Sequence, residues 1–160
     1  MPQPEQTPRP PVPFLLATAC GVGYAPIAPG TCGSIVGLAL WFALPHTTAF
    51  QLALIAVLFV AGAWSGSIVE RHLATRDPGP VVIDEVMGML ITLFMNPVGW
   101  AGAVLAFLLF RVFDIVKPFP ARRLEALHGG AGIMADDAMA AVYANLALRL
   151  LVSGRHWIIG

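Results

Sequence analysis

The chain has 160 residues, of which 58% are hydrophobic and 11% are charged, and its mean hydropathy is +0.78. A soluble domain typically carries about 25% charged residues, so this chain has too few charges to cover a surface that faces water. The formal net charge is zero, which excludes the basic surface typical of nucleic-acid binding. The composition therefore predicts an integral membrane protein that contacts the lipid bilayer and binds no nucleic acid.

The first thirteen residues, MPQPEQTPRPPVP, are rich in proline and polar side chains. They lack the basic start and apolar run of a signal peptide, so we expect a retained, disordered tail over residues 1–13. Residues 14–160 are then expected to form a single membrane-embedded domain. The two cysteines, Cys20 and Cys32, fit no zinc-binding spacing and are expected to be packing residues.

Five apolar segments follow an irregular stretch rich in glycine and proline over residues 14–32. In chain order, the expected helices cover residues 33–44, 48–69, 81–95, 98–113 and 138–152. Only residues 48–69 reach the roughly 20 residues that a membrane crossing needs, whereas twelve residues rise only about 18 Å. We therefore predict an all-α membrane bundle of about four to five membrane-associated helices, some of them short or re-entrant.

Two of these segments carry small residues four positions apart, in GSIVG (33–37) and GAWSG (62–66). This spacing lets helix backbones approach closely in membrane proteins. It predicts tight helix packing at both places and indicates no particular function.

The basic residues orient the bundle. Residues 70–80 and 111–123 contain Arg and Lys, whereas the links at 45–49 and 96–97 contain none. The positive-inside rule therefore places the two basic loops and the N-terminal tail in the cytoplasm. Five of the nine acidic residues then fall at the cytoplasmic ends of three helices, where we expect a functional site. They are Asp84, Glu85, Asp114, Asp136 and Asp137.

The segment RVFDIVKPFP (111–120) places Arg111, Asp114 and Lys117 three residues apart, on one helix face. Taken alone, this spacing suits a salt-bridge ladder near the lipid headgroups as well as a functional site. With two further carboxylate pairs nearby, the same residues could hold Mg²⁺, which prefers hard oxygen ligands, and orient a phosphate. The sequence has no cluster of histidine and cysteine that would suggest zinc or iron instead.

Two segments rich in glycine precede helices. In HGGAGIMADDAMAA (128–141), Asp136 suits an N-cap and Asp137 a favourable interaction with the helix dipole, which explains the pair only in part. In GYAPIAPGTCGS (23–34), Thr31 could cap the next helix. Alternatively, Gly30 and Thr31 could present backbone N–H groups and a hydroxyl to an anion at the helix N-terminus.

Four blocks in this order and spacing resemble the phosphatidylglycerophosphatase A family: GYAPIAPGTCGS, VVIDEVMGM, FRVFDIVKPFPARRLE and GGAGIMADDAMAAVYANL. The resemblance covers residues 20–150. It implies a small bacterial inner-membrane enzyme that hydrolyses phosphatidylglycerophosphate to phosphatidylglycerol and requires Mg²⁺. It also implies that the functional positions are Asp84, Glu85, Asp114, Lys117, Asp136 and Asp137.

The sequence lacks the motifs of cysteine, aspartyl-phosphate and histidine phosphatases, which leaves metal-assisted attack on phosphorus. In this hypothesis the five carboxylates are the candidate metal ligands, and Asp137 accepts a proton from the attacking water. Covalent attack by Asp114 is the open alternative. The candidate substrate-binding residues are Gly30, Thr31, Arg111, Lys117 and Arg122.

Two other functional classes compete with a phosphatase. A small membrane transporter or ion pathway would place its carboxylates near the membrane midplane, within broken helices. A CDP-alcohol phosphotransferase would need a characteristic carboxylate motif on adjacent helical turns, which this sequence lacks. The expected position of the acidic residues at one end of the bundle, beside basic residues, favours an enzyme that acts on lipid headgroups.

Overall fold

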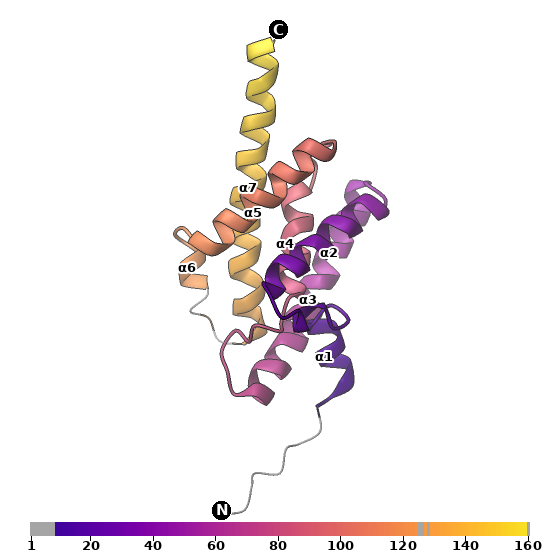
Figure 1. The fold of residues 1–160 in the computed structure, drawn as a ribbon, viewed down its shortest axis with the longest axis vertical. Coiled ribbons are helices and arrows are strands. Elements are labelled where there is room, and N and C mark those ends of the chain that lie inside the picture. The colour runs from indigo at the N-terminus through magenta and orange to yellow at the C-terminus, as the bar shows by residue number, and fades with distance from the viewer. Residues whose placement is uncertain (1–8, 125–126, 128, 160) are drawn as a thin grey trace, which may run out of the picture.

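The computed structural model describes residues 9–124, 127 and 129–159, with side chains up to Ser153. The described residues form helices and connecting loops without a strand, which confirms the predicted all-α class (Figure 1). The predicted tail lies outside the described residues over 1–8, and a helix begins at Pro11. The elements are α1 Pro11–Ala17, the 3-10 helix η1 Val22–Tyr24, α2 Pro29–Ala43, α3 Thr48–Leu73, α4 Ile83–Leu93, α5 Trp100–Val116, α6 Ala121–Leu124 and α7 Gly130–Ile159.

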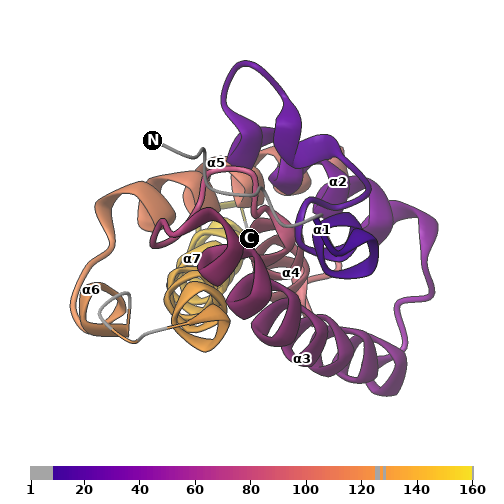
Figure 2. The same ribbon diagram turned by 90° about the horizontal axis from the view of Figure 1, so that it is seen from below.

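Helix α4 is the centre of the bundle. It contacts α2, α3, α5 and α7, and nine of its eleven residues are buried. In the view along the bundle, α4 lies between α2 on one side and α7 on the other (Figure 2). The starts of α2 and α4, the first turns of α7 and the end of α5 lie at the same level of the bundle (Figure 1). Segments far apart in the sequence are thereby brought together there.

The small-residue spacings pack helices closely, as predicted. Gly33 and Gly37 place α2 directly against Val82 and Val86, with no room for a Cβ atom. Gly62 packs in the same way against Met134 of α7. Both glycine pairs therefore serve helix packing, on different partners.

The helices differ widely in length. Helix α3 has 26 residues and is, within the described part of the chain, the one helix long and apolar enough to cross a membrane. Helix α4 has 11 residues, which corresponds to a rise of about 16 Å and is too short for a crossing. The expected mixture of long and short helices is thus present.

Two helices begin earlier than predicted. Helix α7 starts at Gly130, because this glycine packs against the backbone of Ala63 and donates its N–H to the Ser67 hydroxyl at 2.8 Å. The prediction of Asp136 as an N-cap is therefore wrong. Helix α2 starts at Pro29, whose fixed φ suits the first helical position, so Thr31 lies inside the first turn and is not a cap.

The far end of α4 is held by a polar network from α7. The side-chain amide of Asn145 donates to the carbonyl oxygens of Ile91, Thr92 and Phe94 at 2.9–3.0 Å. Arg149 donates to the Asn145 side-chain oxygen at 2.9 Å and to the Phe94 carbonyl at 3.1 Å. These contacts satisfy backbone oxygens that a helix end otherwise leaves without donors.

Candidate active site

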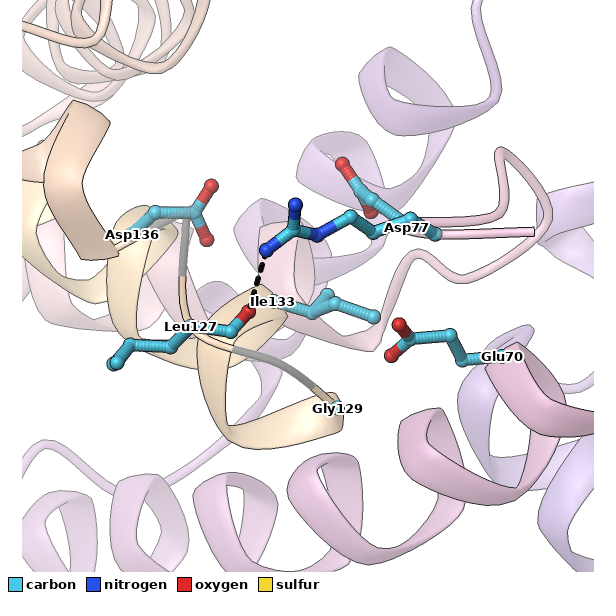
Figure 3. A pocket seen from close by; sticks show the side chains of 7 residues that line it. Glu70, Asp77, Leu127, Gly129, Ile133 and Asp136 are labelled. Carbon is cyan, nitrogen blue, oxygen red and sulfur yellow. Dashed lines mark hydrogen bonds between the residues drawn. The ribbon is translucent and has the colours of Figure 1, made fainter. Parts of the chain in front are cut away.

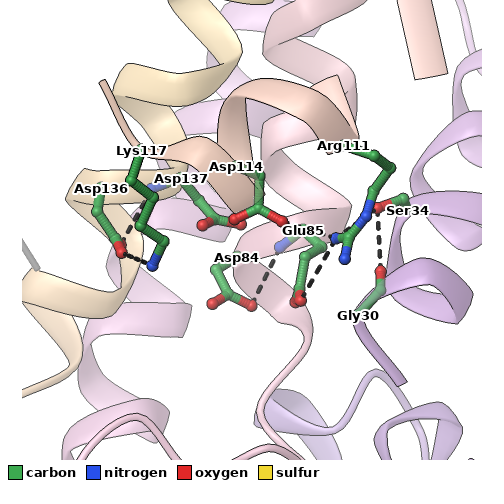
Figure 4. A network of polar contacts seen from close by, with 9 residues as sticks. All are labelled: Gly30, Ser34, Asp84, Glu85, Arg111, Asp114, Lys117, Asp136 and Asp137. Atoms are coloured by element: carbon green, nitrogen blue, oxygen red, sulfur yellow. Dashed lines mark hydrogen bonds and ion pairs between the residues drawn. The ribbon is translucent and has the colours of Figure 1, made fainter. Parts of the chain in front are cut away.

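Five acidic side chains gather where α4 and α7 begin and α5 ends (Figure 4). Four of them are buried, and the side chain of the fifth, Glu85, is 14% exposed. The sequence places them in three separate segments, and the structure brings them together as predicted. The cluster consists of Asp84, Glu85, Asp114, Asp136 and Asp137.

Three of these carboxylates form a candidate metal centre. Asp84, Glu85 and Asp137 each offer an oxygen atom, and these oxygens lie within 4.8 Å of one another. Oε2 of Glu85 and Oδ2 of Asp137 are buried and have no hydrogen-bond partner among the described residues. Buried polar atoms are nearly always paired, so these oxygens point to a missing donor or cation. The donor set fits a hard, oxygen-preferring metal ion.

The electrostatics of the cluster also favour a cation. Burial, followed by repulsion from Glu85 and Asp137, raises the pKa of Asp84 well above its usual range. Burial, followed by repulsion from Asp114 and Glu85, does the same to the pKa of Asp137. Burial also raises the pKa of Glu85. All three groups lie outside α3, the helix long enough to cross a membrane. A bound cation would offset both the cost of burying these carboxylates and the repulsion between them.

Arg111 lies on one side of the cluster. Its Nη1 atom is 2.8 Å from Oδ2 of Asp114, one helical turn away, and 3.9 Å from Oε1 of Glu85. The same nitrogen lies 3.5 Å from the hydroxyl of Ser34 on α2, which in turn donates to the Gly30 carbonyl at 3.0 Å. Arg111 therefore joins three helices at the edge of the acidic cluster.

Lys117 lies on the opposite side. Helix α5 ends at Val116, since Pro118 disfavours a further turn, and Lys117 takes a left-handed conformation with φ 44°. Its Nζ atom therefore reaches Oδ2 of Asp136 on α7, at 2.5 Å. The expected pair of Arg111 and Asp114 is thus present on α5, and Lys117, just beyond the helix, also joins α5 to α7. Burial raises the pKa of Asp136 even though Lys117 opposes this shift.

The remaining predicted substrate-binding residues differ in position. A Cβ atom on Gly30 would collide with the Glu85 carboxylate, so this glycine lets the carboxylate approach the start of α2. Thr31 is half-buried in the first turn of α2. Arg122 is exposed on α6, and no contact among the described residues joins it to the acidic cluster.

The sequence analysis missed two features of this region. Ser34 lies one helical turn after Gly30, a spacing that could have suggested its place beside the site. A small cavity adjoins the cluster at Asp136, and residues from the polar 70–80 segment line it (Figure 3). The sequence analysis identified the 70–80 segment only as a basic loop. The lining consists of Glu70, Arg76, Asp77, Leu127, Gly129, Ile133 and Asp136.

A buried carboxylate cluster with two unpartnered oxygens, flanked by an arginine and a lysine, suits the binding of a metal ion and a phosphate group together. The fold and the site therefore define a class: small helical proteins with a carboxylate-rich centre able to support metal-assisted phosphate chemistry.

Comparison with known proteins narrows this class. Residues 15–152 match the family model of Phosphatidylglycerophosphatase A. The chain is 34% identical to "Phosphatidylglycerophosphatase A" of Escherichia coli K12, over 91% of this chain and 86% of the relative. It is 37% identical to the Haemophilus influenzae protein of the same description, over 91% of this chain and 90% of the relative. The chain thus belongs to the phosphatidylglycerophosphatase A family, whose members are phosphoric monoester hydrolases.

A further relative, from Bacteroides thetaiotaomicron, is described as "Putative phosphatidylinositol-3-phosphatase". It is 41% identical to this chain, over 93% of this chain and 96% of its own length. No solved structure matches the chain.

Proposed function

We propose that this protein is a Mg²⁺-dependent lipid phosphatase of phospholipid biosynthesis, which hydrolyses phosphatidylglycerophosphate to phosphatidylglycerol and inorganic phosphate. The observation that carries the proposal is the trio of Asp84, Glu85 and Asp137, in which two buried oxygens have no partner among the described residues, in a chain of this family. Arg111 and Lys117 flank the trio and supply positive charge for phosphate oxygens.

We place the protein in the bacterial inner membrane as a multi-pass protein, with its site facing the cytoplasm. Helix α3 supplies a crossing, and the basic residues of 70–80 and 111–123 favour the cytoplasmic side for the loops beside the acidic cluster. The short helix α4 is surrounded by α2, α3, α5 and α7, so its sides are covered by protein rather than by lipid.

In the proposed mechanism, Asp84, Glu85 and Asp137 hold the metal ion. When bound, Mg²⁺ supplies Lewis-acid polarisation of the phosphate and a more acidic water. Lys117, held by Asp136, and Arg111, held by Asp114, neutralise the phosphate oxygens. The unpartnered Oδ2 of Asp137 is the proposed acceptor for the proton of the attacking water.

Direct attack by water is favoured over covalent attack by Asp114. Oδ2 of Asp114 lies 2.8 Å from the Arg111 guanidinium, and such a pairing weakens a carboxylate as a nucleophile. Two experiments together test direct attack by water: hydrolysis in ¹⁸O-labelled water, and acid-quench trapping of any phosphorylated protein. Label in the released phosphate with no phosphorylated protein supports direct attack, whereas a trapped phosphoaspartate at Asp114 contradicts it.

A second candidate substrate is phosphatidylinositol 3-phosphate, which the description of the relative with 41% identity suggests. Both lipids carry a phosphomonoester on a polyol that a phosphodiester joins to diacylglycerol. The same hydrolytic centre could act on both phosphomonoesters, and the two lipids differ in the polyol, which is glycerol in one and inositol in the other.

The transporter reading predicts carboxylates along a pathway through the membrane. The acidic residues instead gather in a single cluster at the start of α4, beside Arg111 and Lys117. This arrangement favours an enzyme that acts at the membrane surface.

The test is phosphate release by the purified protein in detergent micelles containing phosphatidylglycerophosphate or phosphatidylinositol 3-phosphate. We expect turnover of phosphatidylglycerophosphate with Mg²⁺, loss of turnover with EDTA, and recovery when Mg²⁺ is restored. Absence of phosphate release from both lipids with Mg²⁺ would refute the proposed function. Faster turnover of the inositol lipid would replace the substrate and leave the reaction type intact.

A further inference from the structure

Ser34 lies beside the acidic cluster, within the GSIVG segment (33–37) whose small-residue spacing predicts only helix packing (Figure 4). We propose that Ser34 is a positioning residue of the hydrolytic centre: its hydroxyl orients the guanidinium of Arg111, so that the Nε and Nη2 edge of this group receives the substrate phosphate. The inference rests on the proposed function and deepens it, because it assigns the residue that sets the orientation of Arg111.

The close packing of α2 against α4 fixes the position of Ser34. Its side chain is fully buried, with 0% exposure. Gly33 and Gly37 on either side of it leave no room for a Cβ atom against Val82 and Val86. A side chain between two helix backbones that approach this closely has little freedom to move. The Ser34 hydroxyl is therefore a fixed point beside the acidic cluster.

The hydroxyl of Ser34 accepts a hydrogen bond from Arg111. Its own proton is donated to the Gly30 carbonyl, one helical turn earlier, at 3.0 Å. Nη1 of Arg111 lies 3.5 Å from the same oxygen, and arginine has donors only, so the serine oxygen is the acceptor. A hydroxyl with no exposed surface does not reach the substrate. Ser34 therefore acts through Arg111 rather than on the phosphate.

Three acceptors surround one nitrogen of Arg111. Nη1 lies near Oδ2 of Asp114 on α5, Oε1 of Glu85 on α4 and the hydroxyl of Ser34 on α2, at 2.8, 3.9 and 3.5 Å. Among the described residues, Nη1 makes all of the polar contacts of Arg111, whose side chain is 19% exposed. The Nε and Nη2 edge is therefore left for a ligand, and this edge matches two oxygens of a phosphate.

Ser34 is the neutral acceptor among these three. Arginine prefers to face a carboxylate with two of its nitrogens, so with carboxylates alone the guanidinium would turn its Nε and Nη2 edge toward Asp114 or Glu85. The contact with Ser34 holds Nη1 from the third side and opposes this rotation. Loss of the hydroxyl should therefore leave the charge of Arg111 in place and change the direction in which its free edge points.

The experiment compares the wild type with Ser34→Ala and Ser34→Cys, using whichever of the two lipids the wild type hydrolyses faster. Ser34→Ala removes the acceptor, and Ser34→Cys fills the space with a poor acceptor. We expect kcat/KM to fall about 5-fold in both variants, since small displacements of a group that binds the reacting phosphate are costly. The half-activating concentration of Mg²⁺ should stay constant, because the metal trio keeps its carboxylates.

A double-mutant cycle separates the orientation of Arg111 from a purely structural role of Ser34. Arg111→Lys keeps the positive charge and has no Nε and Nη2 edge, so Ser34→Ala should lower kcat/KM by less than about 2-fold in this background. A purely structural role would cost the same factor in both backgrounds. Ser65→Ala is the matched control, because Ser65 is also fully buried and its hydroxyl donates within α3, to the Gly62 carbonyl at 3.5 Å. Its kcat/KM should equal that of the wild type.

Binding of inorganic phosphate provides a measurement that needs no turnover. With Mg²⁺ present, phosphate should raise the unfolding temperature of the wild type and of Ser65→Ala equally. The rise should be smaller in Ser34→Ala, because a ligand stabilises a fold according to its affinity. Ser34→Cys takes the place of Ser34→Ala in each comparison if the alanine variant does not fold.

Wild-type kcat/KM in both Ser34 variants would overturn the inference. An equal loss from Ser34→Ala in the wild-type and Arg111→Lys backgrounds would also overturn it. If the wild type released no phosphate from either lipid, the proposed function would fail, and phosphate binding would then decide the role of Ser34 separately. An equal phosphate-dependent shift in the wild type and in Ser34→Ala would refute that role.

Discussion

The two ends of α4 hold polar side chains between the same helices, in opposite states of pairing. At the far end, Asn145 and Arg149 form five hydrogen bonds: four go to carbonyls at or just beyond the end of α4, and in the fifth Arg149 donates to the Asn145 side-chain oxygen. At the near end, Asp84, Glu85 and Asp137 face one another, and two of their oxygens are buried without a partner among the described residues.

The difference separates what stabilises the bundle from what serves the site. A satisfied polar network rigidifies a helix end, whereas a half-satisfied one is costly in a low-dielectric interior. Like charges held together without a counterion are destabilising by themselves, so a function is needed to explain them. Substitutions at the two ends should therefore have opposite effects on stability and activity.

The largest expected effect is on catalysis, from Asp137→Asn. The amide keeps the shape of the carboxylate and removes a proposed metal ligand and proton acceptor, so kcat should fall by at least about 100-fold. The same change removes one of several buried like charges, so the unfolding temperature in EDTA should rise or stay constant. Phosphate release and thermal unfolding, each with Mg²⁺ and with EDTA, measure both effects.

Asp137→Asn should also lose most of the stabilisation that Mg²⁺ gives to the wild type, because a ligand stabilises a fold according to its affinity. Retention of full activity, or of the full Mg²⁺-dependent shift in unfolding temperature, would show that Asp137 is not part of the metal centre.

The second effect is on stability, from Asn145→Leu. Three carbonyls at the end of α4, counting its C-cap Phe94, lose a common donor and Arg149 loses an acceptor, so the free energy of unfolding should fall by about 2–3 kcal/mol. The fraction that stays folded should keep kcat within a few-fold of the wild-type value. Denaturant unfolding and activity per folded protein are the measurements.

Ser153→Ala is the control for this variant, since Ser153 is exposed on the same helix. If Asn145→Leu abolished activity without lowering stability, the division between the two ends of α4 would be wrong.

The sequence was sufficient for the helix class and for the meeting of the acidic residues. Apolar segments alternate with links that are either basic or free of Lys and Arg, and this alternation predicts which helix ends lie on the same side of the membrane. The five acidic residues lie at helix ends on the basic side, so they are predicted to meet. The sequence was insufficient for predicting where helices start, because a glycine there can belong to a loop or can allow close packing within the helix. Gly130 reads as a loop residue, but it begins α7 because a close approach to Ala63 requires it.

Side-chain partners were predicted less well than helix positions. The three-residue spacing identified the pairing of Arg111 with Asp114, which is local to one helix. Lys117, in a left-handed conformation just beyond α5, pairs across the bundle with Asp136 of α7, which spacing along one helix does not predict. The partnership of Ser34 with Arg111 and the cavity at Glu70 depend on contacts between distant segments, which periodicity does not encode.

The third prediction tests whether the cations at the acidic end serve the substrate. Lys117→Met removes the charge next to Asp136 and keeps the length of the side chain. We expect kcat/KM to fall about 10- to 100-fold, since the proposed charge-assisted contact to phosphate is lost, with Mg²⁺ dependence retained. Lys117→Arg should recover part of the activity. Equal activity of Lys117→Met and the wild type would restrict Lys117 to holding Asp136.

The smallest expected effect comes from Gly30→Ala, which changes the acidic end without removing any charge. The added Cβ atom would overlap the Glu85 carboxylate and approach Nη1 of Arg111, so the flexible end of Glu85 must move. Because alanine favours helix over glycine, the stability of the fold should be equal or slightly greater. The displaced carboxylate should nevertheless weaken activation by Mg²⁺ and lower activity about 5- to 10-fold, since small displacements of catalytic groups are costly.

Gly99→Ala is the matched control, because a Cβ atom at Gly99 meets no described atom within 4 Å. Activity titrated against Mg²⁺ distinguishes the two variants: the half-activating concentration should rise for Gly30→Ala and stay constant for Gly99→Ala. If Gly30→Ala instead raised KM for the lipid and left Mg²⁺ activation unchanged, the start of α2 would bind substrate rather than position Glu85. Either result shows whether the start of α2 positions Glu85 or binds the lipid, because the substitution acts on a single carboxylate and leaves the network at Asn145 untouched.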